Sequence, residues 1–436
     1  MSHKKYAAAV GIILMAVLAG GVFWGWRKEE TILELGMFTG SNWDVDSTNS
    51  FVIMDKAIAD FEDSHPGIKI HYSSGILKED YGEWCAGKLL EGKLPDVFMV
   101  LDTDFSQYCS LGALKNLDEL IERDTGFDEA DYFATALNSG KHQGSQYALP
   151  YEVVPTLLFV NKSLLAEENI KMPNQDWTWD DMYEICKKVT KDTDGDGLPD
   201  QFGAYNYNWK YVVNTSGAHI ISDNSQDVNF TSQEVYDALC FTKKIYDLNL
   251  GQKVTQDDFN NGRVAFMPLT FAEYRTYKTY PYRIKKYSTF QWDCTTFPAG
   301  KNGGNTSEVD ALLIGMSAHT KHEKLAWEFL KQLTYEREMQ MDIFRYSQGV
   351  SALKDVTMSE EAAAIVQEDM DEGERVIDSN LLGEVIESGT IAPRFIKYDH
   401  VINLADNEIS RMLEEDKNID STMKIFQRTI SSYLKQ

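Results

Sequence analysis

The chain has 436 residues, of which 43% are hydrophobic and 12% aromatic. It is long enough for two domains and apolar enough for a sizeable core, which excludes a disordered chain. The net charge of −26 argues against nucleic acid or anionic lipid as a partner, because a strongly acidic surface repels both. It is compatible with a neutral ligand, and equally with charge that only maintains solubility.

Residues 1–29 form a targeting segment by their pattern. Lys4 and Lys5 precede an apolar stretch of 21 residues, from Tyr6 to Trp26, which is long enough to cross a bilayer as a helix. We favour an uncleaved signal anchor over a cleaved signal peptide, because apolar residues continue beyond the small-residue sequence at 17–19. Either interpretation places the rest of the chain outside the cytoplasmic membrane.

Strand and helix patterns alternate in the first hundred residues. Apolar residues alternate with polar ones over Thr31–Phe38, and they recur at helical spacing over Phe51–Phe61 until Pro66 and Gly67. Further strands are expected at 68–72 and 96–101, with a helix at 78–91. This alternation predicts a parallel sheet covered on both faces.

The same alternation returns later in the chain. Two short extended runs are expected around Pro150 and Pro155, and Thr178 with Asp181 resembles the capping box of a helix start. Further strands are expected at 262–269 and 311–316, with helices at 235–245, 325–333, 404–413 and 423–434. The five cysteines are scattered, so we interpret most as small buried hydrophobes and leave one disulfide open.

Several segments resemble a known family in consecutive order. They are Pro95-Asp96-Val97-Phe98, Tyr147-Ala148-Leu149-Pro150-Tyr151-Glu152, Trp177-Thr178-Trp179-Asp180, Gly262-Arg263-Val264-Ala265-Phe266-Met267 and Ala326-Trp327-Glu328-Phe329-Leu330. Over about Thr31 to Gln348 the chain is similar to the extracellular solute-binding proteins of sugar ABC importers, the maltose-binding-like group. It lacks the lipobox cysteine that usually anchors such proteins.

The resemblance implies an α/β fold of two doubly wound lobes joined by a multi-crossing hinge, of the type II periplasmic-binding-protein kind. The first lobe would take residues 31–148 and 298–350, and the second 153–295 and 351–436. The resemblance also implies a monomer that binds a mono- or oligosaccharide in the interlobe cleft and delivers it to the transmembrane subunits of an ABC permease. The N-terminal helix would hold it at the membrane.

Candidate ligand-binding residues follow from the chemistry of sugars. Aromatic faces stack on ring C–H groups, while carboxylates and amides pair with hydroxyls, and ligands bind at the carboxyl ends of parallel strands. The candidates are Asn42, Trp43, Asp102, Asp104, Tyr151, Glu152, Trp209, Tyr274, Trp292 and Asp310. For each aromatic residue taken singly, the competing interpretation is core packing. By resemblance, Asp102, Asp104, Glu152 and the loop near Trp43 match cleft positions of the family.

One local motif predicts a structural calcium ion. Asp192, Asp194, Asp196 and Asp200 occupy positions 1, 3, 5 and 9 of a calcium-loop pattern, with Gly197 at position 6. The bidentate glutamate of position 12 is missing, and the competing interpretation is an exposed acidic turn.

Enzyme motifs are scarce. The sequence has no phosphate-binding loop and no nucleophile elbow, and we expect a binding protein with no catalytic residues. Two alternatives stay open: a ligand-sensing subunit for a membrane receptor, and a secreted glycoside hydrolase that uses paired carboxylates such as Asp102 and Asp104.

Overall fold

The computed structural model describes residues 30–43, 45, 51–222, 228–279, 290–368 and 377–435. The anchor segment at residues 1–29 lies outside the described residues. Within the described ranges, no helix is both long and apolar enough to cross a membrane.

One mixed sheet of eight strands runs through the molecule in the order β2-β1-β3-β10-β6-β8-β7, with β9 on β6 as well. The strands are β1 (Thr31–Gly36), β2 (Ile68–Tyr72), β3 (Val97–Val100), β6 (Ala148–Asn161), β7 (Phe202–Ala204), β8 (Val264–Thr270), β9 (Trp292–Thr295) and β10 (Val309–Met316). A separate hairpin joins β4 (Lys141–His142) to β5 (Ser145–Gln146). The parallel pairing predicted for the first hundred residues holds for β2-β1-β3. The strand β7, which was not predicted, also runs parallel to β8, whereas β10 runs antiparallel to both of its neighbours.

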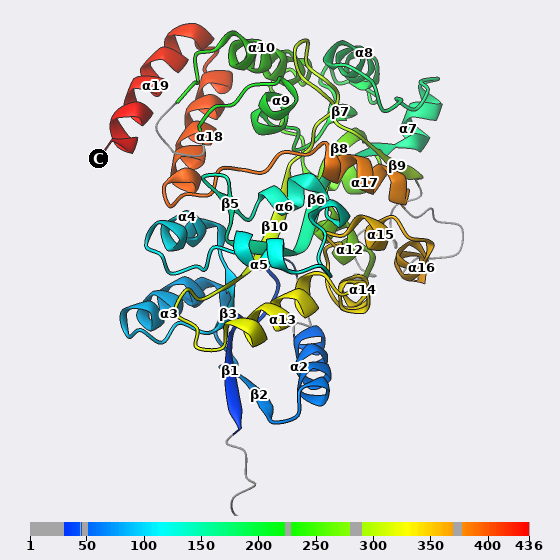
Figure 1. Cartoon of the computed structure of the whole chain (residues 1–436). Helices are drawn as coiled ribbons and strands as arrows, with labels where there is room; N and C mark the ends of the chain where they lie inside the picture. The colour runs from blue at the N-terminus through cyan, green and yellow to red at the C-terminus, as the bar shows by residue number, and fades with distance from the viewer. Residues whose placement is uncertain are drawn as a thin grey trace, which may run out of the picture.

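Helices cover the β1–β3 half of the sheet, whose strands lie in the lower part of Figure 1. They are α2 (Val52–Ser64), α3 (Lys78–Leu90), α4 (Asp102–Ser110), α5 (Asp118–Arg123), η1 (Glu129–Asp131), α6 (Ala134–Asn138), α13 (Glu323–Thr334), α14 (Arg337–Tyr346), α15 (Lys354–Thr357), α16 (Glu360–Glu368) and α17 (Ser379–Glu387). The predicted apolar stripe of α2 is the buried face of that helix, with Ile53, Met54, Ala57 and Phe61 in the core.

A second set of helices surrounds β7 and β8 in the upper part of Figure 1. It comprises α7 (Lys162–Glu167), α8 (Trp179–Val189), α9 (Trp209–Thr215), α10 (Gln233–Leu248), α11 (Gln256–Asn260), α12 (Phe271–Thr279), α18 (Tyr398–Glu414) and α19 (Ile419–Leu434). The capping box predicted at Thr178 and Asp181 is formed in both directions. None of the five cysteines forms a disulfide, and all but Cys240 are buried.

β6 connects the two halves. It is a single strand of 14 buried residues, rather than the two short runs predicted around Pro150 and Pro155. Its first part pairs with β10, from Ala148 to Pro155, and its last part pairs with β8 and β9, from Thr156 to Asn161. Because each half of the molecule uses one end of this strand, rotation of the halves about β6 and β10 is the hinge motion that the fold permits.

The lobe limits differ from the prediction at two places. After Pro298 the chain stays with the second half, where Asn305 Nδ2 donates to the carbonyl oxygens of Trp177 and Phe297, each at 2.8 Å. Helix α17 lies beside α6 in the first half, where Thr135 Oγ1 donates to the Glu387 carbonyl oxygen at 3.0 Å. We therefore propose a return crossing at β10 rather than near 298, and a first lobe that extends beyond residue 350.

Candidate ligand-binding cleft

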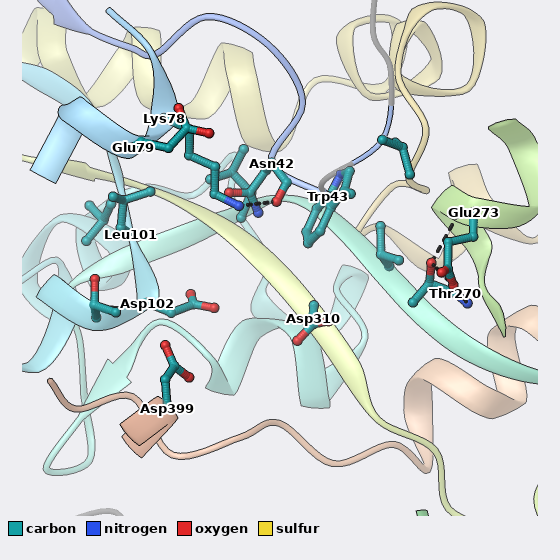
Figure 2. Close-up of a pocket in the computed structure, with 15 residues that line it drawn as sticks. Asn42, Trp43, Lys78, Glu79, Leu101, Asp102, Thr270, Glu273, Asp310 and Asp399 are labelled. Carbon is teal, nitrogen blue, oxygen red and sulfur yellow. Dashed lines mark hydrogen bonds between the residues drawn. The ribbon is translucent and has the colours of Figure 1, made fainter. Parts of the chain in front are cut away.

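A cavity of about 650 Å³ lies where the two halves of the sheet meet. The first half contributes the loop after β1, the end of β3 and the N-termini of α3 and α4, and β10 forms one wall (Figure 2). Thr270 and Glu273 from β8 and α12, and Asp399 from α18, face it from the second half. These are the strand ends at which ligands bind in open α/β sheets. Among the predicted residues, the structure brings together Asn42, Trp43, Asp102 and Asp310 here.

The Trp43 side chain is held in the cavity wall from behind. Its indole Nε1 donates a hydrogen bond of 2.9 Å to Glu152 Oε1, which also accepts from Ser347 Oγ at 2.6 Å and from the Gly349 backbone N–H at 2.5 Å. Glu152 is only 3% exposed. Burial raises the pKa of Glu152, and the three donors oppose that shift. Glu152, predicted as a ligand contact, accepts the Trp43 hydrogen bond and lines a small adjoining cavity of about 40 Å³, but it does not line the 650 Å³ cavity.

Asp102 begins α4 and is paired with a buried cation. Arg394 Nη1 lies 3.0 Å from Asp102 Oδ1, and Arg394 Nη2 donates to the Ala311 carbonyl oxygen at 2.8 Å. The Asp102 side chain is 54% exposed. The solvent that it contacts lies inside the cavity, where the surrounding protein lowers the local dielectric constant. Burial raises the pKa of Asp102, with Asp399 adding to the shift and Arg394 and Lys78 opposing it. Figure 2 shows the Asp102 and Asp399 carboxylates facing each other.

Asp310 and Glu308 form an acidic pair on the cavity wall of β10. Val309 between them is fully buried, so both carboxylates lie on the opposite side of the extended chain, where Asp310 lines the main cavity. Burial raises the pKa of Asp310 to about 7, the charges of Glu308 and Asp102 add to the shift, and Arg394 and Lys78 oppose it. Burial likewise raises the pKa of Glu308, against the influence of Lys210.

A second cavity of about 500 Å³ lies in the second half. Glu308 lines it together with Trp209, Lys210 and Tyr398. The predicted residue Trp209 therefore belongs to this cavity, with its indole Nε1 bonded to Asp406 Oδ1 at 2.6 Å.

Four other predicted residues do not line the main cavity. Asp104 is directed toward α3, since a Cβ atom on Gly82 would lie 3.1 Å from its Oδ2. Tyr274 is 1% exposed and packs against Trp292, whose ring centroid is 5.5 Å away. For these two rings the core-packing interpretation applies. Tyr151 is buried beside Glu152 and lines a small adjoining cavity of about 40 Å³.

Sequence reasoning missed several charged residues of the cleft. Lys78 and Glu79 begin α3, the helix that follows the second predicted strand, and that position was a usable signal. Lys78 Nζ donates to the Asn42 carbonyl oxygen at 2.5 Å. Glu273 caps its own helix by accepting from the Thr270 backbone N–H at 2.8 Å. Asp399 comes from the C-terminal part of the chain, and nothing local in the sequence links it to this cavity.

The predicted calcium loop is an exposed turn after α8. One carboxylate oxygen each from Asp192, Asp194 and Asp200 lies within 4.8 Å of the others. Asp192 accepts backbone N–H bonds from Gly195 at 2.6 Å and Gly197 at 2.7 Å, and these bonds lower its pKa. Asp196, the fourth predicted ligand, lies outside this group of three.

The two half-sheets around one cleft define a solute-binding protein. The family model described as "Bacterial extracellular solute-binding protein" matches residues 46–339, and the chain belongs to this family. This membership places the described part of the chain outside the cytoplasm.

Individual proteins agree with this assignment. The chain is 24% identical over 338 residues to a galactooligosaccharide-binding protein of Bacillus subtilis, which covers 72% of this chain and 74% of that protein. The sugar-binding protein MalE of Xanthomonas citri superposes with a TM-score of 0.75 at 16% identity, over 93% of this chain and 97% of the other. A cyclic alpha-maltosyl-1,6-maltose binding protein of Arthrobacter globiformis gives 0.74 at 16% identity, over 93% and 99%. These likenesses confirm the expected fold class.

Proposed function

We propose that this protein captures a carbohydrate between its two lobes and delivers it to an ABC permease. The observation that carries the proposal is the 650 Å³ cavity, in which the Trp43 ring and several carboxylates come together from both halves of the sheet. An indole face can stack on a sugar ring while carboxylates accept hydrogen bonds from its hydroxyls.

Binding would work by a shift of population. A ligand that contacts Trp43 and Asp102 on one side and Glu273 and Asp399 on the other gains its full set of contacts only when the lobes are closed. Its differential affinity for the closed form therefore sets how far it shifts the equilibrium. The permease would recognise that closed form.

The experiment is a binding screen. Residues 30–436 are titrated with mono- and oligosaccharides by calorimetry and thermal shift, because a ligand specific to the native state raises the melting temperature. Trp43→Ala should abolish binding, while Trp84→Phe on α3 is the matched control for loss of an indole outside the cavity. If no sugar of the panel binds, the proposal fails.

The proposal includes three finer points. The N-terminal helix would serve as an uncleaved membrane anchor, and the protein would act as a monomer. A calcium ion would be held by Asp192, Asp194 and Asp200, whose close oxygens support a cation there. Its role would be to stabilise the turn. Measuring whether sugar uptake requires this protein distinguishes delivery to a permease from a sensing role beside a membrane receptor.

Glycoside hydrolysis is a second candidate, favoured by one observation. Asp310, whose pKa is raised to about 7 near the charge of Asp102, has the protonation behaviour of a general acid beside a second carboxylate. The Asp102–Asp104 pair expected from the sequence does not supply the two carboxylates of a glycoside hydrolase, because Asp104 faces α3. Products released from any oligosaccharide that binds, and lost in Asp310→Asn, would support hydrolysis. Saturable binding without products would exclude it.

A further inference from the structure

Acidic side chains outnumber basic ones around the cleft. Among the described residues, five acidic side chains line the main cavity, namely Glu79, Asp102, Glu273, Asp310 and Asp399, against one cation, Lys78. Glu308 extends this acidic wall into the second cavity. A neutral sugar would add no positive charge to this acidic lining.

The nearby cations are already engaged. Lys78 Nζ donates to the Asn42 carbonyl oxygen, and Arg394 is paired with Asp102 and with the Ala311 carbonyl oxygen. In the second cavity, Lys210 Nζ lies 3.5 Å from Asp406 Oδ2. None of them forms an ion pair with Asp310 or Glu308.

Helix ends compensate part of the negative charge. Glu79, Asp102 and Asp399 lie in the first turns of α3, α4 and α18, where the helix dipole favours a negative charge. Glu273 is bonded within its own helix start. Asp310 and Glu308 lie on extended chain instead, and no described residue donates a hydrogen bond to either carboxylate.

We propose that the carbohydrate bound in this cleft carries a protonated amine, which is held by Asp310 with Glu308 beside it. This inference rests on the proposed function and narrows its ligand to amine-bearing saccharides. An ammonium group supplies the donors and the positive charge that these carboxylates lack, and such charge-assisted bonds are about twice as strong as neutral ones. The raised pKa of Asp310 agrees with an acid whose partner is a ligand and not a side chain.

The test compares sugars of equal length and linkage that differ at one substituent. Tetramers of glucosamine, N-acetylglucosamine and glucose, in both α-1,4 and β-1,4 linkage where the sugar allows it, are titrated by calorimetry at pH 7. We expect the glucosamine tetramer to bind at least tenfold more tightly than either neutral tetramer at low salt. This advantage should shrink as salt is raised, because salt screens the attraction.

Single substitutions test which carboxylate gives the preference for the amine-bearing sugar. Asp310→Asn should remove most of the tenfold preference, and Glu308→Gln a smaller part. Glu122→Gln, which removes the same charge from an exposed position on α5, should leave it unchanged. Circular dichroism spectra like that of the parent protein would establish that each variant is folded.

Each outcome decides between the two proposals. If a neutral tetramer binds as tightly as its amine-bearing counterpart, the inference is overturned and sugar binding stands. If the preference survives in folded Asp310→Asn, the amine is not held there and the inference is also overturned. If no saccharide of any series binds at millimolar concentration, both proposals fail.

Discussion

The turn at residues 192–200 and the cleft wall around Asp310 are both rich in carboxylates, and they differ in what surrounds those groups. In the turn, Asp192 and Asp200 accept hydrogen bonds from residues three to seven positions away. In the cleft, Asp310 faces Glu308, Asp102, Arg394 and Lys78 from three separate parts of the chain. The pKa of Asp192 is lowered, and that of Asp310 is raised. Local backbone donors stabilise a carboxylate, whereas a desolvated group of like charges raises its energy.

A buried carboxylate that accepts three hydrogen bonds gives the largest expected effect. Glu152→Ala leaves the Trp43, Ser347 and Gly349 donors without their acceptor, and we expect unfolding to become easier by about 3 kcal/mol. Denaturant unfolding followed by circular dichroism measures this loss. Glu119→Ala, on the exposed face of α5, is the control. A stability equal to that of the parent protein would contradict the role given to Glu152.

Calcium should act on the turn and not on the cleft. At one hundred times its dissociation constant, calcium that binds only the native protein stabilises it by about 2.7 kcal/mol. The melting temperature should therefore rise on adding calcium and fall on adding a chelator, and Asp192→Asn should abolish the response. Identical melting curves in calcium and in chelator would contradict a calcium site.

Removing a carboxylate from the cleft should have the opposite sign to Glu152→Ala. Below pH 3.8, the ordinary pKa of an aspartate, Asp310 is mostly protonated in both the folded and the unfolded state. Between there and its folded pKa of about 7, the folded state binds more protons, so stability falls as pH rises. Asp310→Asn removes this pH-dependent loss of stability. Without ligand, the substitution should raise the melting temperature by about 2 °C at pH 8. At pH 3.5 the variant should match the parent. Destabilisation at pH 8 would show that Asp310 has a stabilising partner.

Proton release is the smallest signal and the most specific. At pH 6.5, a carboxyl group with a pKa of about 7 is about three-quarters protonated, so an ammonium ligand that requires the ionised form displaces up to about 0.75 proton. Calorimetry in buffers of different ionisation enthalpy counts this proton. A neutral sugar should release none. Equal proton release on binding the ammonium ligand and the neutral sugar would contradict an ammonium group at Asp310.

Much of the fold could be predicted because its signals are local. The stripe of α2, the capping box at Thr178 and the strands β1, β2 and β3 follow from periodicity and turn residues within short windows. The antiparallel direction of β10 and the continuity of β6 could not be read in this way, because both depend on pairing between distant segments.

The site residues also divide into those that a local pattern predicts and those that packing decides. Trp43 and Asp102 could be found because each follows a recognisable strand, and the loop at 192–200 because its spacing is a motif. Asp104 and Tyr274 have the same residue types in the same kind of place, yet they point into protein. The direction of a side chain at the start of a helix is set by packing, and no pattern of residue types contains that information.

The sequence by itself determined the alternation of elements, the acidic balance and the family resemblance, since these depend on composition and on residues near each other in the chain. Only the tertiary structure decided that Glu152 supports Trp43 from behind and that Arg394 and Asp399 meet Asp102. It also decided that Asp310 and Glu308 each face a cavity while accepting no hydrogen bond from any described residue. The physical reason is that desolvation and charge coupling depend on distances across space, which the order of residues does not specify.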